Sequence, residues 1–254
     1  MSIHTVHRDR GVRSDAFAPG FRTRALFGQA LFGQALFGQG GHEPYARNLP
    51  LGLGRLTLRP EPGLQESIGP VHFNMLGWSA PATAGERELL RTLRGPVLDV
   101  GCGPGRMLEA AQELGLASMG VDSSPAAVKL ATDRGGVAIL GSIFDPVPHE
   151  RGWGSALLLD GNIGIGGNIR ALLERVASLL APDGQVLAEA EAPDFLDVAY
   201  LAVLEDSDGR ASAAFPWARA GAKALAFHAA RAGLDAVAAR TVQGRVFLTL
   251  ERRP

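Results

Sequence analysis

The chain has 254 residues, 46% of them hydrophobic and 20% charged, a composition that excludes an intrinsically disordered protein and predicts a globular domain. Lys and Arg total 25 and Asp and Glu total 26, so the formal net charge of −1 argues against nucleic-acid or anionic-membrane partners. The single cysteine, Cys102, excludes an internal disulfide and a cysteine-based zinc site, and no metal is expected.

The N-terminal segment is basic at first and then repetitive. No apolar stretch of a secretory signal directly follows its basic residues, and no apolar run approaches the ~20 residues that cross a bilayer, so a cytoplasmic protein is expected. Three copies of Ala-Leu-Phe-Gly-Gln fill residues 25–39. A five-residue period gives no continuous apolar face on a helix or a strand, which predicts a low-complexity, poorly ordered tail over residues 1–40. A membrane- or partner-binding segment is the alternative.

Residues 41–95 are expected to cover the main domain, which is predicted over residues 96–254. Short apolar runs alternate with prolines and glycines between residues 45 and 81, and a helix is expected at residues 84–93. This segment therefore differs in pattern from the regular chain that follows it.

Strands and helices alternate from residue 96 onward. Apolar strands are expected at residues 96–100, 117–121, 137–140, 156–159 and 185–190. The helices between them are expected at 107–114, after an N-cap at Ser124, and after an N-cap at Asn168. This alternation predicts an α/β fold with a Rossmann-like, doubly wound, mostly parallel seven-stranded sheet.

The last two strands complete that sheet. After a less regular region with an extended segment at 198–204, a helix is expected at 219–232 and strands at 236–241 and 245–250. A tight turn at Gln243-Gly244 joins these strands, so one strand near the C-terminus must be antiparallel.

A glycine-rich turn follows the first strand of the main domain. Residues 97–106 read Val-Leu-Asp-Val-Gly-Cys-Gly-Pro-Gly-Arg. Open α/β sheets bind ligands at the carboxyl ends of their strands, where glycine lets the backbone approach a ligand closely. A dinucleotide fingerprint needs G-x-G-x-x-G, whereas the spacing here is G-x-G-x-G with Arg106 in the sixth position, which disfavours a nicotinamide or flavin cofactor. A turn that binds no ligand is the alternative.

This segment resembles motif I of the class I S-adenosylmethionine-dependent methyltransferases. The resemblance implies S-adenosyl-L-methionine as cofactor, with Asp99 near its amino group. The loop residues implied to lie under its methionine and ribose portions are Gly101, Cys102, Gly103 and Gly105. It also implies that Asp122, beside Ser123, binds the ribose diol, since one carboxylate can accept from both hydroxyls. Asp122 alone could instead be a charge that complements a helix N-terminus.

Two later segments extend the resemblance. Ser142 stands where many family members have an Asp for the adenine amino group, so Ile143 is implied to flank adenine and Asp145 to supply the polar contact. Asp160 and Gly161, after the fourth strand, are implied to border the cofactor sulfonium. Their loop, Gly-Asn-Ile-Gly-Ile-Gly-Gly, together with Pro-Trp-Ala-Arg at residues 216–219, resembles a group of small bacterial, mainly actinobacterial, methyltransferase-like proteins.

Methyl transfer requires few catalytic groups, because a sulfonium already activates the methyl group and a general base is optional. Four residues are candidates for a catalytic role: Asp160, Asn162, His72 and His149. A pocket for a flat or apolar acceptor is expected from Asn162, Trp78, Phe73 and Trp217, although Trp217 could instead only seal the edge of the core. His228 is more simply a packing or surface residue. The acidic residues Glu189, Glu191, Asp194 and Asp197 are expected to be solvated.

The sequence therefore predicts S-adenosylmethionine-dependent methyl transfer to an unidentified small-molecule acceptor. One alternative is an S-adenosylmethionine-binding protein without catalysis, acting as a partner or regulatory subunit. A nicotinamide-dependent oxidoreductase is a third hypothesis, which the glycine spacing disfavours.

Overall fold

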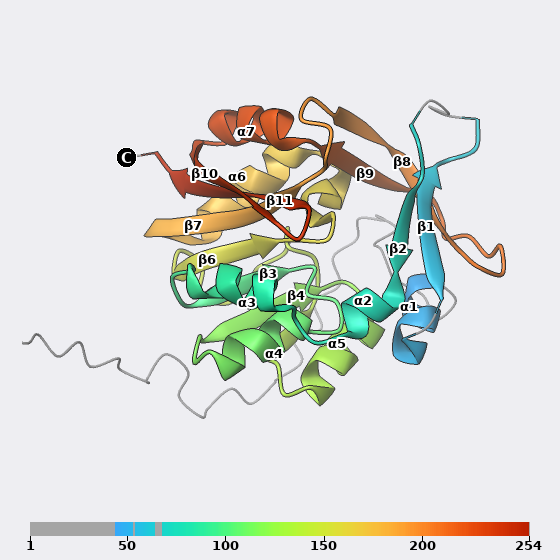
Figure 1. The fold of residues 1–254 in the computed structure, drawn as a ribbon, viewed down its shortest axis with the longest axis horizontal. Helices are drawn as coiled ribbons and strands as arrows, with labels where there is room; N and C mark the ends of the chain where they lie inside the picture. The colour runs from blue at the N-terminus through green and yellow to red at the C-terminus, as the bar shows by residue number, and fades with distance from the viewer. Residues whose placement is uncertain (1–43, 53, 64–67, 254) are drawn as a thin grey trace, which may run out of the picture. The chain divides into compact units, whose positions relative to one another are not determined.

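Seven strands form the main sheet in the order β10-β11-β7-β6-β3-β4-β5 (Figure 1). The computed structural model describes residues 44–52, 54–63 and 68–253, so the predicted tail over residues 1–40 lies outside the described residues. The strands are β3 (Val97–Val100), β4 (Ser118–Asp122), β5 (Ala138–Leu140), β6 (Trp153–Leu158), β7 (Leu180–Ala190), β10 (Leu234–Val242) and β11 (Arg245–Arg252). Strands β3 to β7 pair in parallel, and β11 runs antiparallel to both of its neighbours. The predicted sheet with one antiparallel strand is confirmed.

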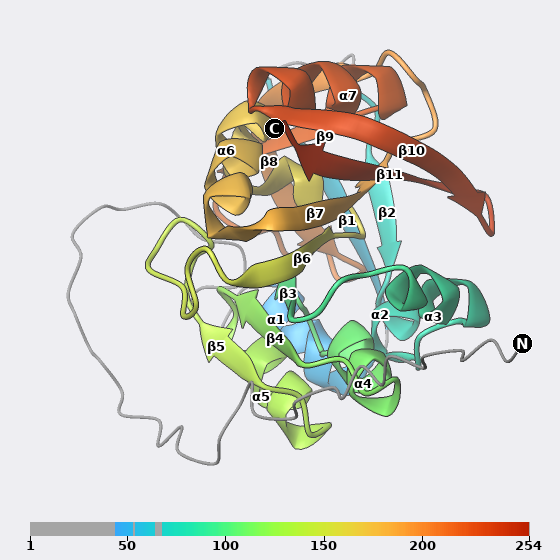
Figure 2. The same ribbon diagram turned by 90° about the vertical axis from the view of Figure 1, so that its left-hand side faces the viewer.

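Helices cover both faces of this sheet. They are α3 (Ala84–Arg91), α4 (Arg106–Glu113), α5 (Pro125–Asp133), α6 (Ile169–Leu179) and α7 (Ala222–Arg231), with the short 3-10 segment η3 (Asn162–Gly167) before α6. Helices α3 and α4 lie on one face, and α6 and α7 lie on the other (Figures 1 and 2). No helix among the described residues is long and apolar enough to span a membrane.

Side-chain caps begin three of these helices. The Ser124 hydroxyl accepts from the Ala127 N–H at 3.3 Å, and Pro125 follows as the first helical residue. The Asn168 side-chain Oδ1 accepts from the Ala171 N–H at 3.0 Å. Both caps confirm their predictions. Thr83 and Glu86 also form a reciprocal capping box at the start of α3.

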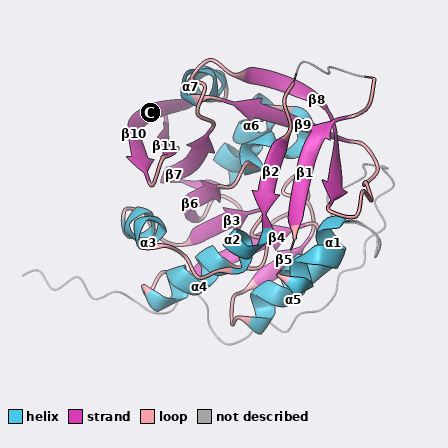
Figure 3. Ribbon diagram, turned by 45° about the vertical axis from the view of Figure 1, so that its right-hand side comes forward, coloured by secondary structure: helices cyan, strands magenta, loops and turns pink. Residues whose placement is uncertain are grey.

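A second, antiparallel sheet in the order β2-β1-β8-β9 stands beside the main sheet (Figure 3). Its strands are β1 (Arg55–Pro60), β2 (Val71–Asn74), β8 (Asp197–Asp206) and β9 (Phe215–Ala220), and the remaining elements are α1 (Pro44–Asn48), η2 (Leu49–Leu51) and α2 (Met75–Ser79). Because β1 pairs with β8, the segment before the main sheet shares a sheet with the chain that follows β7. The boundaries at residues 41–95 and 96–254 remain predictions.

The predicted helix over residues 219–232 is wrong at its start. Arg219 belongs to β9, where it pairs with Val198, and the helix begins at Ala222. Strand β9 buries Phe215 and Trp217 and exposes Pro216 between them, an alternation that suits a sheet with one covered face. Pairing with β8 therefore decides the structure of this segment.

The glycines of η3 allow β9 to lie directly against it. A Cβ on Gly164 would lie 2.3 Å from the Ala218 carbonyl oxygen and 2.6 Å from the Trp217 ring. A Cβ on Gly167, whose φ is +70°, would lie 2.8 Å from the Pro216 Cβ. The glycine-rich loop and the Pro-Trp-Ala segment are therefore the two sides of one close contact.

Candidate functional site

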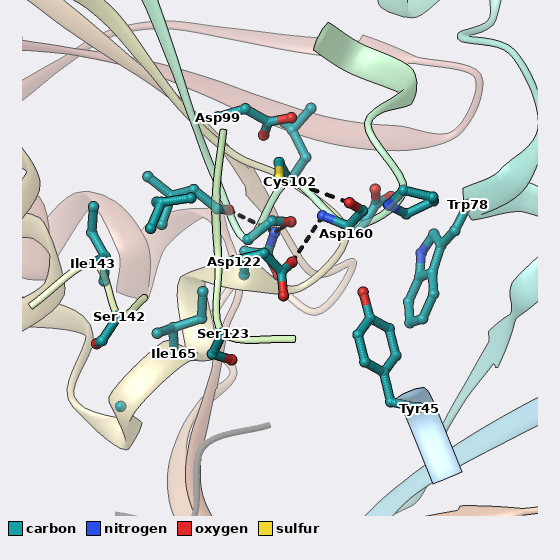
Figure 4. Close-up of a pocket in the computed structure, with 18 of the residues that line it drawn as sticks. Tyr45, Trp78, Asp99, Cys102, Asp122, Ser123, Ser142, Ile143, Asp160 and Ile165 are labelled. Atoms are coloured by element: carbon teal, nitrogen blue, oxygen red, sulfur yellow. Dashed lines mark hydrogen bonds between the residues drawn. The ribbon is translucent and has the colours of Figure 1, made fainter. Parts of the chain in front are cut away.

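One pocket opens at the carboxyl ends of β3, β4 and β6 (Figure 4). Nine of the residues predicted to bind a cofactor line it: Asp99, Gly101, Cys102, Gly103, Asp122, Ser123, Ser142, Ile143 and Asp160. The four residues predicted for the acceptor pocket, Asn162, Trp78, Phe73 and Trp217, line the same pocket. Gly105, Gly161, His72 and His149 are not among its lining residues. The cavity is thus continuous from the glycine loop to the aromatic residues.

Asp122, at the end of β4, is held in place by the backbone. Its two carboxylate oxygens accept from the Gly103 N–H at 2.9 Å and the Ser124 N–H at 2.8 Å. Burial raises its pKa to about 6, while the two backbone N–H groups act in the opposite direction. Each oxygen keeps a further acceptor site, so this carboxylate could accept from two neighbouring hydroxyls.

Asp99, near the end of β3, is only 3% exposed. Burial raises its pKa to about 7, which the nearby Arg106 partly offsets and the carboxylates of Asp160 and Asp122 reinforce. A buried carboxylate is stabilised in its charged form by a cation. Asp99 is therefore placed to receive a cationic group of a ligand in this pocket.

The glycine loop after β3 is shaped by contacts on three sides. Gly101 has a φ of +70°, and a Cβ there would lie 2.7 Å from the Asn162 Nδ2 atom. Gly103 has a φ of +53°, and a Cβ there would point across the pocket and lie 3.5 Å from the Tyr45 hydroxyl. A Cβ on Gly105 would lie 2.7 Å from the Ala131 Cα, so that glycine serves the packing of α4 against α5.

Asn162 ties the loop to the end of β6. Its side-chain amide donates to the carbonyl oxygens of Val100 at 2.8 Å and Gly101 at 2.9 Å. Asn162 lines the pocket. Its side-chain N–H groups bind the glycine loop, and its contact with an acceptor remains a prediction. The buried thiol of Cys102 in the same loop stays neutral, because burial and the carboxylates of Asp99 and Asp122 raise its pKa.

Residues 141–145 close the end of the pocket beyond β5. The Asp145 carboxylate accepts from the Ser142 N–H at 3.1 Å and does not line the pocket. The Ser142 hydroxyl accepts from the Phe144 N–H at 3.2 Å. Arg175 of α6 donates to the carbonyl oxygens of Ile143 at 2.9 Å and Asp145 at 2.7 Å. Asp145 thus shapes the turn, and its contact with the adenine remains a prediction.

Asp160, at the end of β6, has a φ of +54° and is held by charged partners. Its two oxygens accept from Arg106 at 2.6 Å and from Arg245 at 2.8 Å. Its N–H donates to Glu189 at 2.7 Å. Buried Glu86 pairs with both arginines, so five charged residues form one network beside the pocket.

The expectation that Glu189 and Glu191 are solvated is wrong. Arg245 donates to Glu189 from Nε at 2.8 Å and from Nη2 at 2.6 Å, and Arg219 pairs with Glu191. The partner arginines lie far along the chain, Arg245 in β11 and Arg219 in β9, so the spacing of the acidic residues did not reveal these ion pairs.

Aromatic rings form the wall opposite the glycine loop. Tyr45 and Trp78 meet edge to face at 5.9 Å between ring centroids, and Phe73 lies 5.0 Å from Trp78. Phe215 and Trp217 of β9 meet at 5.9 Å. Tyr45 was not predicted, because it lies in a segment without clear periodicity. Its pKa is raised well above its usual value by burial and by Asp122, so the phenol stays protonated.

The two histidine candidates lie outside this wall. His72 of β2 is exposed, and its Nδ1 atom lies 3.1 Å from the Thr57 hydroxyl. His149 contacts the Trp153 ring edge to face at 6.0 Å. His228, expected at the surface or in packing, contacts Asp197 at 3.0 Å. Neither candidate is within the pocket lining where a general base would act.

Comparison with known proteins agrees with this geometry. Residues 97–184 match the family model described as a methyltransferase domain. No curated protein sequence matches the chain. An S-adenosylmethionine-dependent methyltransferase from Bacteroides fragilis, solved with S-adenosyl-L-homocysteine, is similar over 89% of this chain and 98% of its own, at 20% identity and a TM-score of 0.68.

Two further solved structures are similar over 70% of this chain. The CcbJ methyltransferase from Streptomyces caelestis matches over 93% of its length, at 16% identity and a TM-score of 0.54. The 1,6-didemethyltoxoflavin-N1-methyltransferase from Burkholderia thailandensis matches over 81% of its length, at 20% identity and a TM-score of 0.50. Residues 97–184 are therefore similar to a methyltransferase domain, and the chain has the fold of the S-adenosylmethionine-dependent methyltransferases.

Proposed function

We propose that the protein transfers a methyl group from S-adenosylmethionine to a small-molecule acceptor. The observation that carries this proposal is the pair of buried carboxylates, Asp99 and Asp122, on either side of a glycine loop in one pocket. Carboxylates suit an ammonium and a ribose diol, which are the polar groups at the two ends of the methionine-ribose portion. The residues present therefore fit this cofactor.

We assign a part of the cofactor to each group of residues that lines the pocket. Asp122 accepts from the ribose hydroxyls, and Asp99 pairs with the amino group. Ser142 and Ile143 border the adenine, and the loop from Gly101 to Gly103 lies under the methionine and ribose portions. When bound, S-adenosylmethionine supplies a methyl group activated by a sulfonium.

The chain's own residues then position and shield the acceptor. Aromatic side chains from the N-terminal segment and from β9 exclude water and offer a flat or apolar acceptor a surface on which to pack. Both Asp160 oxygens already accept from arginines, so Asp160 is better suited to holding a donor group than to removing a proton. Orientation and desolvation are the main sources of rate acceleration in such a site.

Titration calorimetry with S-adenosylmethionine and NAD tests the cofactor, and the first but not the second should bind. Transfer of radiolabel from S-adenosylmethionine to the small-molecule fraction of a cell extract tests the reaction. Binding without any labelled product would favour the non-catalytic alternative. We further propose a cytoplasmic enzyme without a nucleic-acid substrate, in keeping with its balanced charge and single buried thiol.

A further inference from the structure

The pocket end formed by Tyr45, Trp78 and Asp160 lies away from Ser142 and Ile143 (Figure 4). We infer that this end takes a small planar acceptor that carries a basic amine, such as an arylalkylamine. The inference rests on the proposed function and names the substrate class of the same site.

The shape of this end favours a planar group. Phe73 and Trp78 come from the N-terminal segment and Trp217 comes from β9, so aromatic rings approach from two separate parts of the chain. A Cβ on Gly161 would lie 4.0 Å from both the Phe73 and the Trp217 rings, which shows that the two walls converge over the end of β6. Offset and edge-to-face contacts with such rings favour a flat ligand.

The charge of the lining favours a cation over an anion. With Asp99 and Asp122 assigned to the cofactor, Asp160 is the carboxylate that the described lining leaves for the acceptor, and Arg106 is the guanidinium beside it. Arg106 already pairs with Glu86 and Asp160, so an anionic acceptor would meet carboxylates without a free cationic partner in this lining. Aromatic faces also attract cations.

Asp160 is the group placed to hold the amine. Its side chain retains 28% exposure although both oxygens accept from arginines. A carboxylate oxygen has two acceptor sites, so each oxygen keeps one for a further N–H donor. Its positive φ is uncommon for a residue other than glycine. Glu189 accepts from its backbone N–H, and Arg106 and Arg245 hold its carboxylate at the pocket.

Methyl transfer to this acceptor balances without another reactant. The bound ammonium releases one proton to water, and the neutral nitrogen keeps its lone pair. That lone pair forms the N–C bond while the C–S bond breaks and its electron pair goes to sulfur. The products are the methylated ammonium, which carries the positive charge that sulfur loses, and the neutral thioether of S-adenosylhomocysteine.

Matched probes test the inference in the full chain saturated with S-adenosylhomocysteine. Calorimetry would compare tryptamine with tryptophol, indole-3-propionate and 2-cyclohexylethylamine, which change the charge or the planarity of one scaffold. Tryptamine should bind at least tenfold more tightly than each of the others. Equal or tighter binding of indole-3-propionate, or no binding of tryptamine, would overturn the inference. Failure to bind S-adenosylhomocysteine at all would instead count against the proposed function.

Two variants test separately the contribution of the aromatic wall and that of the Asp160 carboxylate. Trp78→Leu should weaken tryptamine and tryptophol binding severalfold with little change for S-adenosylhomocysteine, whereas Phe195→Leu, at an exposed ring outside the pocket, should change neither. Asp160→Asn should remove the preference for tryptamine over tryptophol, provided that S-adenosylhomocysteine still binds. If Trp78→Leu binds tryptamine as tightly as the Phe195→Leu control does, the planar group lies elsewhere.

Discussion

Two buried carboxylates of the same residue type acquire different properties from their surroundings. Asp122 accepts from two backbone N–H groups and has its pKa raised to about 6, whereas Asp99 relies on the more distant Arg106 and has its pKa raised to about 7. Direct hydrogen bonds stabilise a charged carboxylate more effectively than a separated cation does. Asp122 is therefore the better fixed acceptor, and Asp99 is the group that responds most to a cationic ligand.

Replacing Asp122 by Ala should weaken S-adenosylmethionine binding by about 1.5–3 kcal/mol, the range for losing hydrogen bonds to a charged group. Calorimetric titration measures the change, and a thermal melt checks that the variant is folded. Asp133→Ala, which removes an exposed carboxylate of α5, is the matched control and should bind normally. Unchanged affinity in Asp122→Ala would remove this residue from the site.

Binding of S-adenosylmethionine should strengthen as the pH rises from about 5.5 to about 7.5. The cofactor's amino group stays largely protonated in that window, while Asp99, whose pKa is raised to about 7, loses its proton and gains the charge that attracts the ammonium. Calorimetry at several pH values would show the trend. Asp99→Asn should bind more weakly at pH 7.5 and show a shallower pH dependence; a slope equal to that of the native protein would exclude Asp99 as the ammonium partner.

The same carboxylate also links pH to folding. Its pKa is raised in the folded state above the unfolded value of about 3.8, so the native state holds the proton more tightly. Its contribution therefore stabilises the ligand-free protein most at the acidic end of this range and is lost as the pH rises through about 7.

At the level of elements, the sequence predicted the parts that depend on neighbouring residues better than the parts that depend on strand pairing. The caps at Ser124 and Asn168 and the strand before each glycine turn depend on neighbouring residues, and the sequence predicted them. Strand β9 was mistaken in part for helix because its structure depends on β8 and on the η3 glycines, which lie far away in the chain. Such pairing leaves little trace in the periodicity of the segment itself.

Gly164→Ala should destabilise the protein by about 1–3 kcal/mol, because the new methyl would overlap the Ala218 carbonyl and the Trp217 ring and force β9 away from η3. Urea unfolding gives the free energy. Gly77→Ala is the matched control, since a Cβ there meets nothing within 4 Å. A Gly164→Ala variant as stable as this control would show that β9 moves without cost.

Across the whole molecule, the site is assembled from parts that the sequence keeps apart. Arg106 and Arg245 reach Asp160 across 54 and 85 residues, and Arg245 reaches Glu86 across 159. Motif spacing predicted the glycine loop, and the resemblance to the methyltransferases implied Asp99 and Asp122, which lie in the same strand-helix-strand unit. The ion network was not predicted, because only the complete topology brings α3, α4, β7 and β11 to the residue that follows β6. Tyr45 was not predicted, because its segment has no clear periodicity.

Deleting residues 1–40 should leave the melting temperature and the affinity for S-adenosylmethionine nearly unchanged. The five-residue repeat offers no continuous apolar face for docking, and the described lining of the pocket begins at Tyr45. A deletion of residues 1–48 is the matched comparison, because it also removes Tyr45, which is buried in a core with Leu49 and Leu56, and it should lower the melting temperature. Thermal melts and calorimetry on both truncations measure these effects. A large loss in the shorter truncation would mean that the repeat packs on the domain or completes the site.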